Sequence, residues 1–224
     1  MNLHDDMHLR VSSFAQDAHW LPSPNPAVQR RMLDRVGGEV ARATTIVRYA
    51  PQAQFARHVH GGGEEILVLE GVLSDEHGDY SAGTYLRNPP GSAHAPFSLG
   101  GCLLLVKLWQ FAADDRAHVR IDTHAAPWLP APVSGIEVQT LHQHRGVKTS
   151  IERWRANTQF APREQQGGEE VLVLAGTFSD AFGRYPAGSW LRQPCRTQFT
   201  PHTGQEGAVL YVKVGHLNAT FLAP

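Results

Sequence analysis

The sequence contains a long internal repeat. Residues 55–96 align with residues 160–201 at a constant offset of 105 positions, and 20 of the 42 aligned pairs are identical. The clearest match joins Gly-Gly-Glu-Glu-Ile-Leu-Val-Leu-Glu-Gly at 62–71 with Gly-Gly-Glu-Glu-Val-Leu-Val-Leu-Ala-Gly at 167–176. A unit this long that occurs twice indicates two copies of one domain, because solenoids need three or more short repeats.

The repeat extends beyond this block toward the amino terminus. Trp20-Leu-Pro-Ser-Pro matches Trp128-Leu-Pro-Ala-Pro, so each copy spans about 105 residues. A chain of 224 residues is long enough for two domains of about 100 residues, each with its own core. We predict a boundary near residues 114–126, with one domain at 1–115 and the other at 116–224.

Several segments in each copy are typical of β-strands. They are short and rich in Val, Ile, Leu and aromatic residues, and clusters of Gly, Pro, Asp and Ser separate them. The expected strands are 44–49, 66–69, 84–86 and 103–108 in the first copy, and 149–154, 171–174 and 209–214 in the second. Hairpin turns are expected at 74–79 and 179–184, and one weak helical pattern covers 28–34. Regularly spaced short strands predict an all-β fold, with each copy a sandwich or a small barrel.

Composition excludes several classes of function. The formal net charge is −1, and the longest basic block is the Arg30-Arg31 pair, which argues against nucleic-acid and anionic membrane surfaces. The longest apolar runs have the length of a strand and cannot span a bilayer. The amino terminus lacks the pattern of a secretory signal, and Cys102 and Cys195 form no Cys-x-x-Cys motif. We therefore expect a cytoplasmic protein without disulfides.

The 13 histidines include a group with the spacing of a metal site. His58 and His60 are two residues apart, so on an extended strand both side chains point to the same face. Glu64 follows four residues later, and His94 about 30 residues beyond that. Three imidazoles and one carboxylate suit zinc, iron, manganese, copper or nickel better than calcium or magnesium.

These residues follow the two sequence motifs of the cupin superfamily. The first motif is matched by His58, His60, Glu64 and Gly71, and Gln52 stands in place of its leading glycine. The second motif is matched by Gly83, Pro89, Gly91 and His94, and Ser98 stands in place of its asparagine. The chain thus resembles a cupin with two domains. The resemblance implies two tandem jelly-roll (double-stranded β-helix) barrels. It also implies one divalent transition metal per chain, whose ligands would be His58, His60, Glu64 and His94.

The amino-acid sequence within and between the motifs is similar to that of the cupin domain of ChrR, a zinc-binding anti-sigma factor. The similarity includes Gly-Gly-Glu-Glu-Ile-Leu-Val-Leu-Glu-Gly and the later Ala-Gly-Thr-Tyr-Leu-Arg-Asn-Pro-Pro-Gly. It implies zinc as the first choice of metal, with iron, manganese and nickel as alternatives, and a regulatory or stress-response role. In ChrR a separate helical domain with His and Cys ligands binds the sigma factor. Residues 1–40 contain no cysteine and are too short and too proline-rich to be that domain, which argues against direct inhibition of a sigma factor.

The duplication separates residues that serve the fold from candidates for function. Positions 58, 60, 64 and 94 correspond in the second copy to Arg163, Gln165, Glu169 and Phe199. This set cannot hold a transition metal, so we expect one ion per chain and a degenerate second barrel. We expect Arg163 and Glu169 to pair in place of the ion, because an unpaired buried carboxylate is costly. Both copies keep the glutamates at 65 and 170 and the arginines at 87 and 192, which favours structural salt bridges.

Two functions of different classes stay open, and the resemblance favours the regulatory one, with a dioxygenase as the alternative. Zinc completes a tetrahedral shell with four protein ligands, which favours a closed site with a regulatory role. Iron, manganese or nickel prefers six ligands and would leave two positions for substrate and dioxygen or water, which favours a dioxygenase acting on a small oxygenated compound such as a diketone. Either function is compatible with a small-molecule ligand in the N-terminal barrel. The resemblance also implies a homodimer or a pseudo-dimer of the two copies; no catalytic residue is identified.

Overall fold

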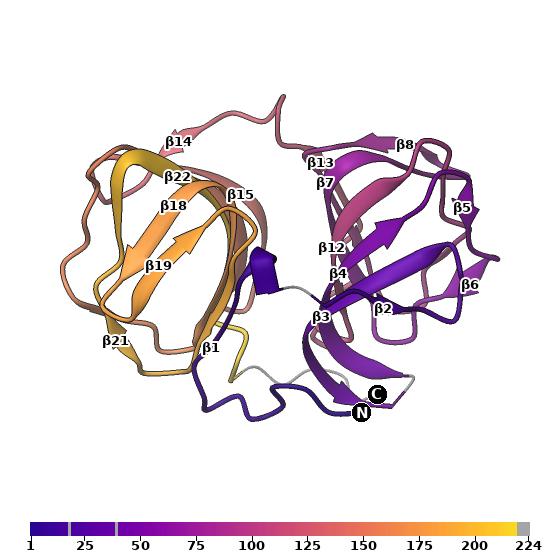
Figure 1. The fold of residues 1–224 in the computed structure, drawn as a ribbon, viewed down its shortest axis with the longest axis horizontal. Coiled ribbons are helices and arrows are strands. Elements are labelled where there is room, and N and C mark those ends of the chain that lie inside the picture. Colours follow the sequence, from indigo (N-terminus) through magenta and orange to yellow (C-terminus); the bar gives the residue numbers. More distant parts are fainter. Residues whose placement is uncertain (18, 39, 219–224) are drawn as a thin grey trace. The chain divides into compact units, whose positions relative to one another are not determined.

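The computed structural model describes residues 1–17, 19–38 and 40–218, and the backbone alone for Arg163. Strands make up most of this chain, and the one helical element among these residues is a short 3-10 turn, η1(Ala15–Asp17) (Figure 1). None of the described segments forms a helix long and apolar enough to cross a membrane. The all-β prediction is confirmed.

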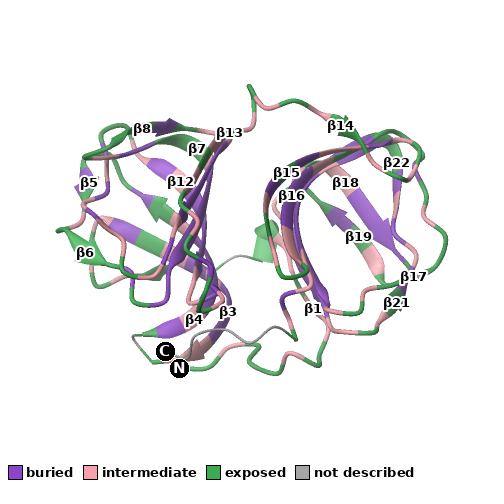
Figure 2. Ribbon diagram, turned by 180° about the vertical axis from the view of Figure 1, so that it is seen from behind, coloured by how far each residue is buried: buried purple, intermediate pink, exposed green. Residues whose placement is uncertain are grey.

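The N-terminal unit is built on one large antiparallel sheet. Its strands run in the order β13(Val119–Asp122), β9(Thr84–Asn88), β7(Glu64–Asp75), β12(Cys102–Leu108), β4(Ala41–Tyr49), β3(Val28–Gly37) and β2(Leu21–Pro22). The shorter strands of this unit are β5(Ala53–Gln54), β6(His58–Val59), β8(Gly78–Ser81), β10(Ala93–His94) and β11(Phe97–Ser98). In Figure 2, β4 and β12 are buried over most of their length and β6 is exposed.

The C-terminal unit repeats this arrangement. Its sheet runs in the order β1(Val11–Ser13), β20(Trp190–Gln193), β18(Glu169–Asp180), β22(His202–Val214), β16(Val147–Trp154), β15(Ile136–His144) and β14(Leu129–Pro130). The shorter strands are β17(Arg163–Glu164), β19(Gly183–Pro186) and β21(Gln198–Phe199). The expected strands of both copies are present, most of them longer than the sequence pattern indicated. The two expected hairpins are also present, as β7–β8 and β18–β19.

The helical pattern expected at 28–34 is wrong, because these residues belong to β3 and pair with β4. The pairing register shifts between Met32 and Asp34, which marks a bulge in the strand. A bulge adds one residue and interrupts the alternation of inward and outward side chains. The apolar positions of this segment therefore lose the period of two that identifies a strand.

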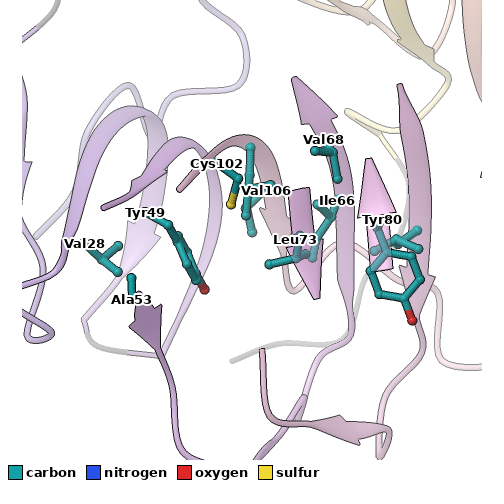
Figure 3. Close-up of a cluster of buried hydrophobic side chains, with 11 residues drawn as sticks. Val28, Tyr49, Ala53, Ile66, Val68, Leu73, Tyr80, Cys102 and Val106 are labelled. Carbon is teal, nitrogen blue, oxygen red and sulfur yellow. The ribbon is translucent and has the colours of Figure 1, made fainter. Parts of the chain in front are cut away.

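The cores of the two units differ in the size of their side chains. The N-terminal core is mainly aliphatic, and Figure 3 shows Ile66, Val68, Leu73 and Val106 packed around its centre. In the C-terminal core, Trp154, Phe178 and Phe199 occupy the positions of Tyr49, Leu73 and His94. The Trp154 ring centroid lies 4.7 Å from that of Phe160 and 5.6 Å from that of Phe178. Aromatic rings therefore take up much of the interior of the C-terminal barrel.

Each unit is completed by a strand from the other copy of the repeat. In β1, Val11 lies opposite Arg192 of β20, and in β13, Val119 lies opposite Arg87 of β9. The two valines are 108 positions apart, which is also the offset between the two Trp-Leu-Pro segments. Strands β1 and β13 are therefore equivalent, and the two copies exchange them.

Because of this exchange, the residues of each compact unit differ from those of the predicted domains 1–115 and 116–224. One unit contains residues 1–5 and 19–125, and the other contains 6–17 and 126–218 of the described chain. The amino-terminal segment thus contributes to the barrel formed by the second copy. A contact made by this segment therefore stabilises a unit whose other residues lie more than 100 positions away.

Arg10, next to β1, makes the main polar contacts of the exchanged segment. Its Nη2 lies 3.0 Å from Oδ2 of Asp180, and its Nε donates to Oε1 of Gln193 at 3.1 Å. The guanidinium also lies 4.5 Å from the ring centroid of Phe182. The Asp180 side chain is fully buried, whereas that of Arg10 is 20% exposed. Arg10 therefore supplies the cation that a buried carboxylate needs.

We predict that Arg10→Met lowers the free energy of unfolding by about 2 kcal/mol in urea denaturation. Breaking a buried ion pair costs about 3–5 kcal/mol, and the partial exposure of Arg10 and the bonds that Asp180 keeps reduce this cost. The control is Arg155→Met, because Arg155 is exposed and lies 4.0 Å from Glu137. Equal stability of the two variants would contradict a structural role for the Arg10–Asp180 pair.

Candidate metal centre

Three imidazoles come together in the N-terminal barrel, with His60 and His94 buried and His58 exposed. His58 of β6 lies opposite His94 of β10 in the strand pairing, and His60 follows two residues after His58. Each ring offers one nitrogen, and these three atoms all lie within 4.8 Å of one another. Val59, between the two histidines, is 66% exposed and points away from them. The alternation expected for this segment therefore places both histidines on the inner side.

Glu64, the first residue of β7, reaches the same place. Its Oε2 lies 3.5 Å from Nε2 of His60 and 3.5 Å from Nε2 of His94. Asn88, opposite Glu64 on β9, donates to the same oxygen from Nδ2 at 3.2 Å. The structure thus brings all four predicted ligand residues together.

Hydrogen bonds orient two of the rings. His58 Nδ1 lies 3.0 Å from the carbonyl oxygen of Ala56, and His94 Nδ1 lies 3.1 Å from Oδ2 of Asp75. Donation from Nδ1 leaves the lone pair of Nε2 free to bind a metal. The Nε2 atom of His60 is buried and has no hydrogen-bond partner. A buried ring nitrogen without a partner, next to two oriented imidazoles and a carboxylate, fits a transition-metal ion.

Burial sets the charge states of this group. Together with the smaller effect of the neighbouring His58, it lowers the pKa of His60 to about 4, so His60 is neutral at pH 7. The neutral ring is the form that binds metals. Burial raises the pKa of Glu64, while His94 and the bond from Asn88 act in the opposite direction. A bound cation would favour the ionised form of Glu64.

We predict that Asp75→Asn weakens metal binding by about tenfold. Asp75 holds the proton on Nδ1 of His94 and itself accepts a bond from the Tyr80 hydroxyl at 2.9 Å. Changes to a group that orients a metal-binding histidine typically cost about 10–100-fold in affinity. A competition titration with a chelator measures this. Asp180→Asn is the matched control, because Phe199 stands where His94 would be; equal losses in both variants would contradict the orienting role.

A cavity of about 220 Å³ adjoins three of the four residues. His58, Glu64 and His94 line it, and most of its other walls are apolar. Tyr49 also lines the cavity, and burial raises the pKa of its phenol strongly, with a further contribution from Glu64. The cluster is therefore accessible to a small molecule from the barrel interior.

The corresponding place in the C-terminal unit has a different character. Gln165 is half-buried, and Glu169 and Phe199 are buried. The side chain of Arg163 lies outside the described residues, so its pairing with Glu169 stays a prediction. Within the part of the chain that the structure describes, the one group of three or more His, Cys, Asp or Glu residues whose ligand atoms all lie within 4.8 Å of one another is that of the three histidines, and Glu64 lies beside two of them.

A buried ion pair lies on the other face of the N-terminal sheet. Arg87 of β9 binds Glu65 of β7, its neighbour in the strand register, and also Asp115 at 2.5 Å. All three side chains are at most 6% exposed. The structural salt bridge expected from the duplication is therefore present in the first copy. In the second copy, Glu170 accepts a bond from Nε1 of Trp190 at 3.0 Å.

Three residues around the metal centre and its cavity were not predicted from the sequence: Asp75, Asn88 and Arg30. Asp75 is shared with the second copy as Asp180, so a comparison that seeks differences assigns it to the fold. Asn88 corresponds to Gln193 in the second copy, and so conservative a difference gives no indication that Asn88 has a functional role. Arg30, which lines the cavity, could have been found, because an offset of 108 aligns it with an uncharged residue.

Two antiparallel barrels, one of them with a cluster of three histidines and a glutamate, define a cupin. Solved structures share this fold. A protein of Nostoc punctiforme, whose description proposes a dioxygenase, has a TM-score of 0.76 and 14% identity, over 97% of this chain and 88% of that one. The Escherichia coli pirin in complex with nickel(II) has a TM-score of 0.64 and 12% identity, over 92% and 99% of the two chains. The Lactobacillus farciminis oxalate decarboxylase formate complex has a TM-score of 0.63 and 13% identity, over 92% and 86%.

The family follows from the sequence. The model of the ChrR cupin-like domain matches residues 9–112 and 116–218, so the chain belongs to this family and carries two copies of the domain. Each matched stretch begins just before an exchanged strand, β1 or β13. No curated protein matches the chain.

Proposed function

We propose that this chain is a metal-dependent cupin that binds one divalent transition metal in its N-terminal barrel and acts on a small oxygenated molecule there. His58, His60, Glu64 and His94 would hold the ion. The observation that carries the proposal is the cavity lined by three of these four residues. A cavity beside the ligands supports an open coordination site, which favours iron, manganese or nickel and the dioxygenase alternative.

The residues around the cavity have distinct roles in this proposal. The bound ion would supply Lewis-acid chemistry and, if it is iron, redox chemistry. Ala56 and Asp75 keep the rings of His58 and His94 in the orientation that exposes Nε2. The apolar walls offer hydrophobic contacts to the carbon chain of a substrate. Tyr49 is protonated at neutral pH and, with its raised phenol pKa, also at alkaline pH, so it can donate a hydrogen bond to a substrate oxygen.

Family membership favours a second candidate, a regulatory protein that senses a metal or small molecule. A closed zinc site with four protein ligands would suit this role. The same four residues would bind zinc, and the cavity would serve as a receptor pocket without turnover.

Elemental analysis of protein purified without a metal-affinity tag tests both candidates. It is paired with oxygen uptake after anaerobic iron loading, with pentane-2,4-dione and related diketones as substrates. One ion per chain with diketone-dependent uptake would support the dioxygenase. One zinc per chain without oxygen uptake would support the regulatory candidate and contradict the proposed dioxygenase activity. Protein that neither contains nor takes up an ion would contradict both.

A further inference from the structure

We infer that the N-terminal barrel recognises a small organic anion, with Arg30 binding a carboxylate at one end of the molecule. The other end would present oxygen atoms to the metal. This inference rests on the proposed function, since it names the class of molecule that the same site takes.

Arg30 is a cation that faces the cavity of the candidate metal centre. It lies on β3 opposite Val47 of β4 and two residues after the buried Val28, so it shares the inner side of the strand. Arg30 lines the same cavity as His58 and His94. The charge is therefore available to a ligand that also reaches the histidines.

The guanidinium of Arg30 has unused hydrogen-bonding capacity. Its Nε is buried without a partner, and its Nη2 donates one long bond of 3.4 Å to the carbonyl oxygen of Pro22 at an exposed position. Among the described residues, no carboxylate forms an ion pair with it. Guanidinium groups bind carboxylates through two parallel N–H donors, so an arginine in this state is suited to an anionic ligand.

The duplication links Arg30 to the metal centre. At the offset of 108, Arg30 corresponds to Val138, which lies opposite Glu152. The second copy therefore has an acidic residue at this place and no cation. At the offset of 105 that holds from this strand onward, Tyr49 corresponds to Trp154, whose Nε1 donates to Glu152 at 2.9 Å. The cation and the phenol occur in the copy with the three histidines and are lost together with them.

The volume of the cavity limits the size of the ligand, and its apolar walls favour an aliphatic middle part. Its volume of about 220 Å³ lies below the range of roughly 300–1,000 Å³ that is usual for ligand pockets. Val28, Ile66, Leu73 and Val106 form apolar walls and are seen in Figure 3. These features describe a short aliphatic chain with a carboxylate at one end and a chelating pair of oxygens at the other, as in a diketo acid.

A pair of compounds of equal length isolates the contribution of the carboxylate. 4,6-Dioxoheptanoate carries a β-diketone and a carboxylate, and heptane-2,4-dione has a methyl group in place of that carboxylate. Isothermal titration of the zinc-loaded protein gives both affinities. We expect the anion to bind about tenfold more tightly, because a hydrogen-bonded charge pair contributes about that factor.

Variants test whether Arg30 causes the difference. Arg30→Met should bring the two affinities within about twofold of each other, and Arg30→Lys should retain part of the preference. Arg48→Met is the control, because Arg48 is exposed and lies 3.9 Å from the ring centroid of Trp20. It should keep the full preference.

Metal content measured on every sample separates the possible failures. Protein that takes up no ion would refute the proposed function, whatever the carboxylate does. Two results would overturn the inference without contradicting the metal centre. One is metal-loaded protein that binds both compounds equally. The other is an Arg30→Met variant that keeps the preference for the anionic compound.

Discussion

His60→Ala is expected to remove the metal from the N-terminal barrel, so that its content falls from about one ion per chain to less than about a tenth. His60 Nε2 is buried without a hydrogen-bond partner, 3.5 Å from the Glu64 carboxylate, which is the position of a ligand atom. Changes to groups that merely orient a ligand cost about 10–100-fold, so the loss of a ligand should weaken binding by more than about 100-fold. Elemental analysis after dialysis measures the remaining ion.

Gln165→Ala provides the matched control for this prediction. Gln165 holds the same position in the second copy and is half-buried. Its replacement should leave the metal content unchanged, and circular dichroism should show that both variants keep their strands. Full metal occupancy in His60→Ala would contradict the assignment of this residue as a ligand.

Arg87→Met is expected to destabilise the protein by about 3–5 kcal/mol, the usual cost of removing one partner from a buried ion pair. The change leaves Glu65 and Asp115 without the cation that lies between them. Arg87 also lies 4.0 Å from the ring centroid of Phe111, so its replacement disturbs packing as well as charge. Urea denaturation measures the loss, and Arg87→Lys should recover part of it.

Arg153→Met tests whether burial causes this effect. Arg153 binds Glu137 at 3.0 Å, but its side chain is 45% exposed. Exposed pairs contribute about 0–1 kcal/mol, so this variant should remain within about 1 kcal/mol of the natural protein. Comparable losses in Arg87→Met and Arg153→Met would show that burial does not strengthen the Arg87 cluster.

Strands and hairpins could be predicted because local sequence determines them. Short apolar runs ended by Gly, Pro or Asp predicted β7, β12 and their counterparts, and a bulge between Met32 and Asp34 concealed β3. The strand exchange could not be predicted. Since the copies are similar, the strand that contains Val11 and the strand that contains Val119 can each complete either barrel. The choice between them depends on contacts such as that of Arg10 with Asp180.

The candidate metal centre was predictable for a related reason. His58 and His60 follow a strand alternation, and motif spacing supplied Glu64 and His94. The groups around them come from distant segments and carry no spacing signal: Asp75 reaches His94 from the end of β7, and Arg30 reaches the cavity from β3. Tertiary structure alone brings these side chains together.

Anomalous X-ray diffraction from crystals of the untagged protein, recorded above and below the absorption edge of the metal, locates the bound ion. We expect one peak per chain, bounded by His58, His60, Glu64 and His94, and none among Gln165, Glu169 and Phe199. A second peak in the C-terminal barrel, or an ion bound elsewhere with the histidine cluster empty, would contradict it.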